Sequence, residues 1–183
     1  MKSFLAVAAI STLFLTTACA QLQTLAGRQG TATVALTGVN GEVRGGGEVW
    51  QGNDGQVHVD LRLQGLPLGT HAIHFHAIGK CDPTPAPSFS SAGAHYNPSN
   101  MQHGLNNPAG PHAGDAPNFT VDANGSAHVE FVTNRVTITA GASTLFDADG
   151  SSLVVHAAAD DQVSQPAGNS GDRIACGVLR QVL

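Results

Sequence analysis

The chain has 183 residues, 22 of them glycine; only 11 % are charged, and the formal net charge is −5. This length suits one domain with a hydrophobic core, and the excess of acidic over basic residues argues against nucleic acid as a partner. Abundant glycine, with β-branched residues in short runs, is typical of an all-β domain with many turns.

The first twenty residues have the pattern of an export signal. Lys2 precedes an apolar stretch over residues 4–15, which is too short to span a bilayer. Ala18-Cys19-Ala20 fits the small-x-small rule and predicts cleavage after Ala20. The alternative is lipidation of Cys19, which would attach the protein to a membrane, but Thr16 stands where such signals prefer leucine.

These features divide the chain into three parts. We expect residues 1–20 to be the export signal, residues 21–30 a flexible lead and residues 31–183 the folded domain. The mature protein would then reside in the periplasm or elsewhere in the cell envelope.

Short alternating segments predict eight β-strands in the folded domain. They cover residues 31–36, 42–51, 56–63, 71–78, 127–132, 136–139, 153–157 and 174–179. Turn signals such as Asn53-Asp54-Gly55 and Asn124-Gly125 lie between them. Eight short strands in one domain predict a closed or nearly closed antiparallel sandwich.

Two long connections interrupt the regular spacing of the strands. Residues 79–118 hold most of the prolines, and residues 160–173 form the second connection. Irregular loops of this length in a compact domain are usually functional.

Three cysteines are present, and Cys19 belongs to the signal region. Cys81 and Cys176 remain as an even pair in a chain predicted to enter an oxidising compartment. The pair can form a disulfide that closes a long loop, or it can remain as two buried thiols.

Seven potential metal ligands recur at suggestive spacings. His74 and His76 alternate on a predicted strand, so both rings leave the same face. Four more follow along the first long loop, and the last lies on a later strand. The seven are His74, His76, His95, His103, His112, Asp115 and His156. Seven ligands are too many for one tetrahedral ion and suit two ions that share a ligand.

The residue types point to copper and zinc. Three imidazoles and a carboxylate suit tetrahedral zinc, whereas four imidazoles without a thiolate suit tetragonal copper. An imidazole has two ring nitrogens, so a single histidine can bridge the two ions.

Three segments in this order resemble the signatures of Cu/Zn superoxide dismutase. They are His-Ala-Ile-His-Phe-His at 71–76, Ala-Gly-Ala-His-Tyr-Asn-Pro at 92–98 and Gly-Asp-Arg-Ile-Ala-Cys-Gly-Val at 171–178. The resemblance extends over residues 31–182. It implies an eight-stranded Greek-key β-barrel that converts superoxide to dioxygen and hydrogen peroxide, using a redox-cycling copper bridged to a structural zinc.

The resemblance also implies a role for each residue. The copper ligands would be His74, His76, His95 and His156, and the zinc ligands would be His95, His103, His112 and Asp115. Asp160 would accept hydrogen bonds from His74 and His103. His95 would exchange copper for a proton during turnover, and Arg173 would dock the anion. Cys81 and Cys176 would form the intrasubunit disulfide.

Two features depart from the family pattern or stay open. Residues 160–172 contain no lysine, and Asp172 directly precedes Arg173, so the source of electrostatic steering is in question. The dimer interface varies within the family, so both a homodimer and a monomer stay open.

A noncatalytic periplasmic copper- or zinc-binding protein is the alternative function, but such a relative would be expected to lack a copper ligand or the arginine.

Some similar residues are predicted to play no part in the metal site. His71 points away from His74 and His76, which predicts a hydrogen-bonded core residue. His58 and His128 are predicted to lie on the surface, and Asp161 to be a solvated neighbour of Asp160.

Overall fold

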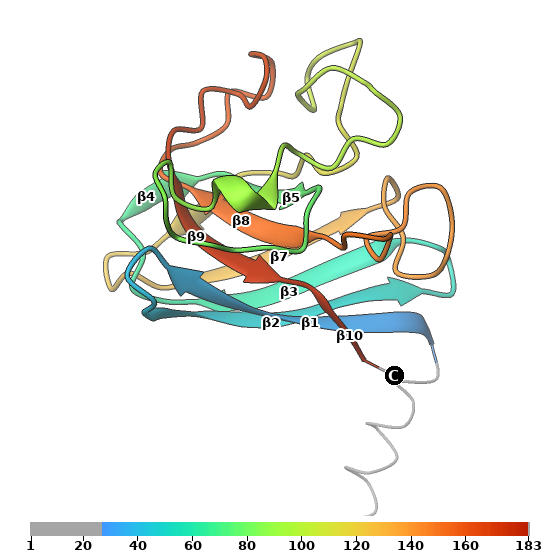
Figure 1. Ribbon diagram of the computed structural model, residues 1–183, viewed down its shortest axis with the longest axis horizontal. Helices are drawn as coiled ribbons and strands as arrows, with labels where there is room; N and C mark the ends of the chain where they lie inside the picture. The colour runs from blue at the N-terminus through green and yellow to red at the C-terminus, as the bar shows by residue number, and fades with distance from the viewer. Residues whose placement is uncertain (1–26, 183) are drawn as a thin grey trace, which may run out of the picture.

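The computed structural model describes residues 27–182, so the predicted export signal and residues 21–26 of the lead lie outside the described residues. The described chain is all β apart from one 3₁₀ turn, η1 (Ser90–Ala92) (Figure 1). Its strands are β1 (Arg28–Gly38), β2 (Val43–Gly52), β3 (Val57–Leu63), β4 (Gly69–His71), β5 (Ile73–His76), β6 (Phe119–Val121), β7 (Ala127–Thr133), β8 (Ser152–His156), β9 (Arg173–Val178) and β10 (Arg180–Val182).

Eight of these strands form one antiparallel sheet. Its order is β5-β8-β9-β1-β2-β3-β7, with β10 paired to β1, while β4 and β6 form a separate two-stranded sheet. The large sheet curls over, so that β5, β8 and β9 face β1, β2, β3 and β7 across the core (Figure 1). The neighbours β5–β8, β9–β1 and β3–β7 are far apart in sequence, as a Greek-key arrangement requires. The predicted all-β antiparallel fold is confirmed.

Strict alternation creates the core. In β3 the apolar side chains Val57, Val59, Leu61 and Leu63 are buried, and the residues between them are more exposed. Phe75 of β5 packs in the same buried cluster from the opposite layer. Each such side chain contributes about 1.5–3 kcal/mol when it is removed from water. This core holds β5 and β8, which carry three of the predicted metal ligands.

The predicted strand 71–78 is divided in the structure. The chain changes sheets at Ala72: β4 pairs with β6, and β5 pairs with β8. The Ala72 amide donates to the carbonyl of Ala158, 2.9 Å away. The pattern of alternation is the same on both sides of Ala72, so it gave no sign of the change. The three-residue strand β6 was not predicted.

The prediction of a strand over residues 136–139 is wrong. Val136 and Ile138 are buried as the alternation suggests, but only an isolated bridge joins Thr137 to Thr144. The amides of Ile138 and Thr139 instead donate to the side-chain oxygen of Gln51, at 2.9 and 3.1 Å. A side-chain acceptor therefore takes the place of a neighbouring strand.

The first and last predicted strands also differ in their bounds. β1 starts at Arg28, and Arg28 and Gly30, expected to belong to a flexible lead, are paired with β2. The predicted strand 174–179 ends one residue earlier, and Leu179 separates β9 from β10.

The two long connections start at opposite ends of an antiparallel pair, the first after β5 and the second after β8. The yellow-green part of the first connection and the orange-red second connection both rise above β5 and β8 in Figure 1. In the part of the chain that the structure describes, no helix is long and apolar enough to cross a membrane.

Candidate metal centre

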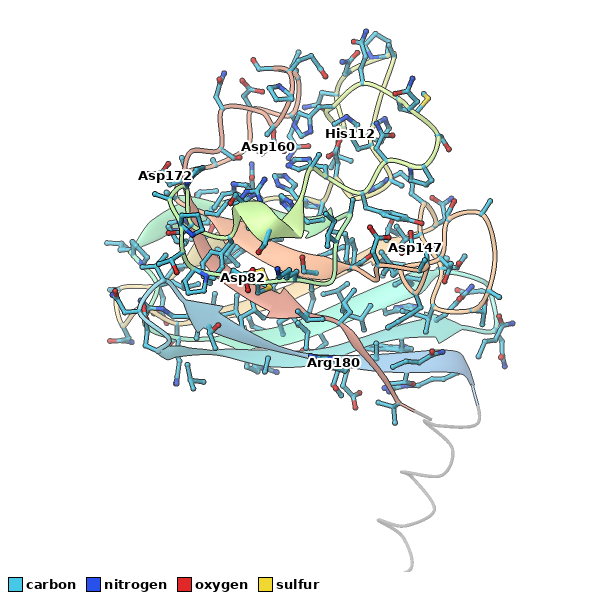
Figure 2. The ribbon with its side chains drawn as sticks, in the orientation of Figure 1. Asp82, His112, Asp147, Asp160, Asp172 and Arg180 are labelled. Carbon is cyan, nitrogen blue, oxygen red and sulfur yellow. A yellow bond between two sulfur atoms is a disulfide. The ribbon has the colours of Figure 1, made fainter. Side chains whose placement is uncertain are left out.

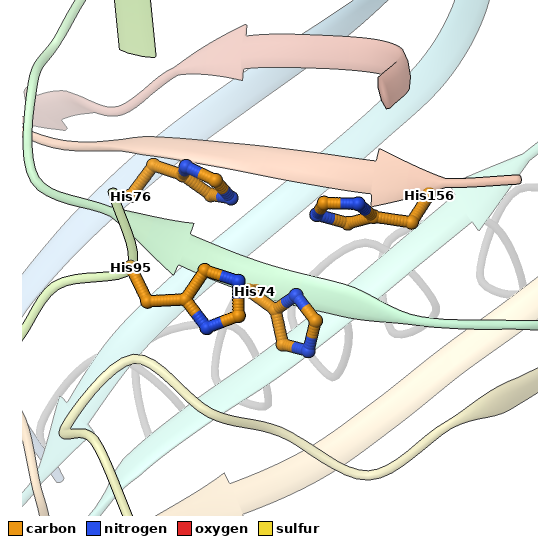
Figure 3. Close-up of side chains that lie close together, drawn as sticks. All are labelled: His74, His76, His95 and His156. Carbon is orange, nitrogen blue, oxygen red and sulfur yellow. The ribbon is translucent and has the colours of Figure 1, made fainter. Parts of the chain in front are cut away.

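Four histidines converge between β5, β8 and the first long loop (Figure 3). His74 and His76 come from β5 and His156 from the end of β8, while His95 reaches them through a β-bridge to His76. One ring nitrogen of each lies within 4.8 Å of the others. All four residues are at most 6 % exposed.

These four histidines also share an unusual hydrogen-bonding state. Nδ1 of His74 and Nε2 of His76, His95 and His156 are buried without a hydrogen-bond partner. Buried polar atoms are rarely left without partners, so four unpaired nitrogens that point to one place fit a site for a cation. Four imidazoles without a thiolate fit copper.

The remaining nitrogens fix the orientation of the rings. His76 Nδ1 is 3.0 Å from the carbonyl of Gly93, and His156 Nδ1 is 3.3 Å from that of Gly171. Each contact leaves the Nε2 lone pair directed at the cluster, which is the usual way proteins set the tautomer of a metal-binding histidine.

A second group of ligands gathers around Asp115. Its Oδ1 atom lies 2.9 Å from Nδ1 of His95, 2.9 Å from Nδ1 of His103 and 3.3 Å from Nδ1 of His112. Its Oδ2 atom accepts hydrogen bonds from the amides of Gly104 and His112, at 2.8 and 2.9 Å. The carboxylate is thus held by the backbone of its own loop, and the three imidazoles with one carboxylate fit tetrahedral zinc.

His95 belongs to both groups. Its Nδ1 faces Asp115, and its Nε2 faces the four-histidine cluster. The two ligand sets together contain every metal ligand predicted from the sequence.

Asp160 links the two groups from the second loop. Its Oδ2 lies 2.9 Å from Nε2 of His74, and its Oδ1 lies 3.0 Å from Nε2 of His103. Figure 2 shows Asp160 and His112 on the two long loops, above the same side of the sheet. The structure therefore places Asp160 where the sequence predicted it.

Two residues that hold Asp160 were missed. The side chain of Asn118 pairs with its backbone in both directions, at 2.8 and 2.9 Å. A Cβ atom on Gly168 would come within 1.7 Å of the Asp160 carboxylate, and Gly168 also has a positive φ of 64°. Only glycine fits there. Neither residue type carries a signal in sequence that distinguishes it from a loop residue.

The electrostatics favour the metal-binding protonation states of both carboxylates and of His95 and His156, but not of His103. Burial raises the pKa of Asp115 and Asp160, but hydrogen bonds from their histidine partners outweigh it and hold both pKa values well below the usual range. Burial and neighbouring histidines lower the pKa of His95 to about 4 and that of His156 to about 3. Burial lowers the pKa of His103, but its hydrogen bonds to Asp115 and Asp160 outweigh this effect and raise the pKa to about 9. Carboxylates and neutral imidazoles are the forms that bind metal ions.

Arg173 lies beside the four-histidine cluster. It starts β9 opposite His156 and is half buried. Its guanidinium donates to the carbonyls of Phe89, at 2.6 Å, and Gly93, at 2.7 Å. Because Gly93 also accepts from His76, one carbonyl positions both the arginine and a ligand of the cluster.

The predicted disulfide is present. Cys81 and Cys176 are bonded, with an S–S distance of 2.00 Å and a Cα–Cα distance of 5.6 Å. The alternative of two free thiols is therefore wrong. The bond fastens the start of the first long loop to β9, two strand positions from the end of that strand.

The histidines predicted to be outside the site are outside it. His71 is buried, and its two ring nitrogens lie 2.8 and 2.9 Å from the carbonyls of His156 and Pro67. His58 stacks on Trp50 at the surface. His128 is exposed beside Asp60 and Glu130, and its Nε2 already has a partner in Asp60, 2.8 Å away.

Asp161 is exposed, as predicted. Its carboxylate accepts from the backbone amides of Val163 and Ser164. It shapes its own loop and does not reach the ligand groups.

The chain matches the family model of copper/zinc superoxide dismutase (SODC) over residues 39–179. It is 44 % identical over 151 residues to "Superoxide dismutase [Cu-Zn] 2" of Aquifex aeolicus, covering 81 % of this chain and 86 % of that protein. It is 41 % identical over 152 residues to "Superoxide dismutase [Cu-Zn]" of Caulobacter vibrioides, covering 81 % and 85 %.

The fold agrees with solved structures. The crystal structure of a SOD-like protein from Bacillus subtilis superimposes with a TM-score of 0.74 at 35 % identity, covering 80 % of this chain and 96 % of that one. Similarity of sequence, fold and ligand geometry thus all point the same way, and the chain belongs to the copper/zinc superoxide dismutase family.

Proposed function

We propose that the protein is a copper/zinc superoxide dismutase that converts two superoxide anions and two protons to dioxygen and hydrogen peroxide. The observation that carries the proposal is His95, which is shared by two complete and buried ligand sets. One set has the composition that copper prefers and the other the composition that zinc prefers. The relatives named as copper–zinc superoxide dismutases support the same activity.

We assign copper to His74, His76, His95 and His156, and zinc to His95, His103, His112 and Asp115. Copper, when bound, supplies the one-electron couple that removes an electron from one superoxide and gives it to another. The zinc ligands keep the first long loop folded over the site. Asp160 holds the rings of His74 and His103 in a fixed relative orientation.

His95 is positioned to handle a proton. Its Nδ1 is held on the zinc side by Asp115, so only Nε2 is available on the copper side. When this nitrogen is not bound to metal it can take up a proton and pass it to the peroxide product.

Arg173 provides the fixed positive charge beside the copper set. Its two hydrogen bonds to backbone carbonyls hold the guanidinium in place, so little motion is needed when a small anion docks. The chain carries a net charge of −5, so the attraction of superoxide must arise locally, from the metals and Arg173 in a focused field.

The alternative of a noncatalytic metal-binding protein is not favoured. Every proposed copper ligand is present and buried, and Arg173 lies beside them. The experiment that tests the proposed function is a measurement of superoxide dismutation by the protein after loading with copper and zinc. Activity that disappears on selective removal of copper supports it, and full metal content without dismutation refutes it.

We also propose that the protein is exported, with residues 1–20 acting as the signal. The disulfide supports this location, because such bonds persist in oxidising compartments. Cleavage after Ala20 would release a soluble periplasmic form, whereas lipidation of Cys19 would retain it at a membrane.

A further inference from the structure

We infer that Gln162 and Gln165 form a neutral latch that fastens the loop carrying Asp160 to the loop carrying the zinc ligands. Here the latch means these two residues together with their contacts on residues 103–116. The inference rests on the proposed function, because it assigns positioning roles around the proposed zinc site.

Gln165 pairs with the backbone of His103 in both directions. The His103 amide donates to Gln165 Oε1 at 2.8 Å, and Gln165 Nε2 donates to the His103 carbonyl at 2.9 Å. A side-chain amide thereby satisfies both backbone groups of a zinc ligand. Because the ring of His103 also contacts Asp115 and Asp160, both its backbone and its side chain are held by hydrogen bonds.

Gln162 makes a second set of contacts two residues after Asp160. Its Oε1 accepts from the amide of Leu105 at 3.2 Å, and its Nε2 donates to the carbonyl of Ala116 at 3.2 Å. Its own carbonyl accepts from the amide of Asn106 at 3.1 Å. The side chain therefore spans the loop on both sides of Asp115.

The backbone geometry shows how close the two loops are. Gln162 has a φ of 63°, a left-handed conformation that is uncommon for a residue with a side chain. A Cβ atom on Gly104 would come within 2.2 Å of the Gln162 carbonyl oxygen. Gly104 itself has a φ of 111°, so glycine is required there for conformation and for space.

The latch also contacts Asp160, which in turn contacts His74 of the proposed copper set. The amide of Gln162 donates to Asp160 Oδ1 at 2.6 Å, and the same carboxylate contacts His74 through Oδ2. A displacement of the zinc loop would thus shift Asp160 and, through it, the ring of His74. The loop 160–172 contains no lysine, so uncharged amides provide this attachment without adding charge beside the site.

The latch is tested with Gln165→Glu, because Gln165 is exposed and its replacement does not threaten the core. Glutamate keeps the length of the side chain but loses the donor to the His103 carbonyl. Gln64→Glu is the matched control, since Gln64 is exposed directly after β3, outside both long loops, and its replacement makes the same change in charge. Gln165→Met, which keeps the length without charge or hydrogen bonds, separates the hydrogen bonds from the added charge.

Two measurements that do not depend on dismutation activity test the latch. The first is the dissociation constant for zinc in copper-free protein, by competition with a chelator. We expect it to rise about tenfold in both Gln165 variants, as for other groups that orient metal ligands, and to stay unchanged in Gln64→Glu. The second is hydrogen–deuterium exchange of residues 160–172 with and without zinc. We expect zinc to protect this segment in the wild type and much less in the Gln165 variants.

The outcomes distinguish the latch from the zinc site itself. A purely structural contact would lower protection equally with and without zinc, and this result would refute the latch. Wild-type zinc affinity in both Gln165 variants would also refute it, while leaving the zinc assignment intact. A wild-type protein that binds no zinc would instead overturn the proposed function on which the latch rests.

Discussion

His95 is the residue through which the two ligand sets depend on each other. One ring nitrogen cannot serve both sets, but the two nitrogens of His95 point in different directions. Nδ1 points to Asp115, and Nε2 points to the other histidines. The remaining ligands belong to one set each, so their removal should have separable effects.

Replacement of a ligand that belongs to the copper set alone should leave zinc in place. We expect His76→Ala or His156→Ala to abolish dismutation while the protein stays folded and loaded with zinc. His128→Ala removes an exposed histidine and should change neither activity nor metal content. Elemental analysis and an activity assay on the same samples check both expectations.

Asp115→Ala should remove zinc, whereas the copper-set variants should keep it. It removes a proposed zinc ligand and the acceptor of two backbone amides, so zinc should be lost and residues 79–118 should loosen, with copper retained more weakly. Metal analysis together with limited proteolysis measures the two effects. If this variant and His76→Ala had the same metal content, the division of the ligands would be wrong.

Arg173 should act mainly on the capture of substrate. Arg173→Ala should lower the second-order rate of dismutation by about 10- to 100-fold, and the remaining rate should depend less on ionic strength. Arg62→Ala removes the same charge from an exposed position on β3 and should have little effect. An unchanged rate for Arg173→Ala at low salt would show that steering arises elsewhere.

At the scale of elements, two irregular loops are held in place by contacts distributed along them. The first is attached by the disulfide at its start and by the carboxylate of Asp115 farther along. The second is attached by Asp160 and the latch glutamines. Order in so much irregular backbone therefore depends on cross-links between loops and not on repetitive structure.

Removal of the disulfide should destabilise the protein without changing its ligands. We expect the double variant Cys81→Ala, Cys176→Ala to lose about 2–5 kcal/mol of unfolding free energy, because the bond closes a loop with a sequence separation of 95. Denaturant unfolding of both proteins, with and without a reductant, measures the difference. Stability that is identical to that of the reduced wild type supports the interpretation, and stability equal to that of the oxidised wild type contradicts it.

The elements also show what the sequence could reveal. Alternation placed His74 and His76 on one face of a strand, and the resemblance to the family implied the full set of ligands. Alternation could not show that the chain changes sheets at Ala72, since the pattern continues across the break. It also could not show that Gln51 replaces a strand partner for residues 138 and 139. Contacts such as those of Asn118 and Gln165 depend on tertiary positions that no local pattern encodes.

At the scale of the whole molecule, an acidic chain must attract an anion. The one exposed lysine that the structure describes, Lys80, is paired with Asp82 at 2.9 Å. We expect the metal centre and Arg173 beside it to supply most of the local positive charge that attracts superoxide.

The mass of the native protein tests the proposed export and processing. We expect a mature chain that begins at Gln21 and contains one intramolecular disulfide, since Cys81 and Cys176 are bonded to each other. Intact-mass spectrometry of the native protein checks this. A chain that begins with acylated Cys19 would refute the soluble form, and a bond from Cys19 to either other cysteine would refute the assigned pairing.

The central claim is that two ions share His95 and that one of them carries out dismutation. The most direct test is to measure the metal content and the superoxide dismutation rate of one purified sample, reconstituted with both metals. We expect about one copper and one zinc per chain, with activity that follows the copper content. Zinc alone after copper reconstitution, or both metals without dismutation, would contradict it.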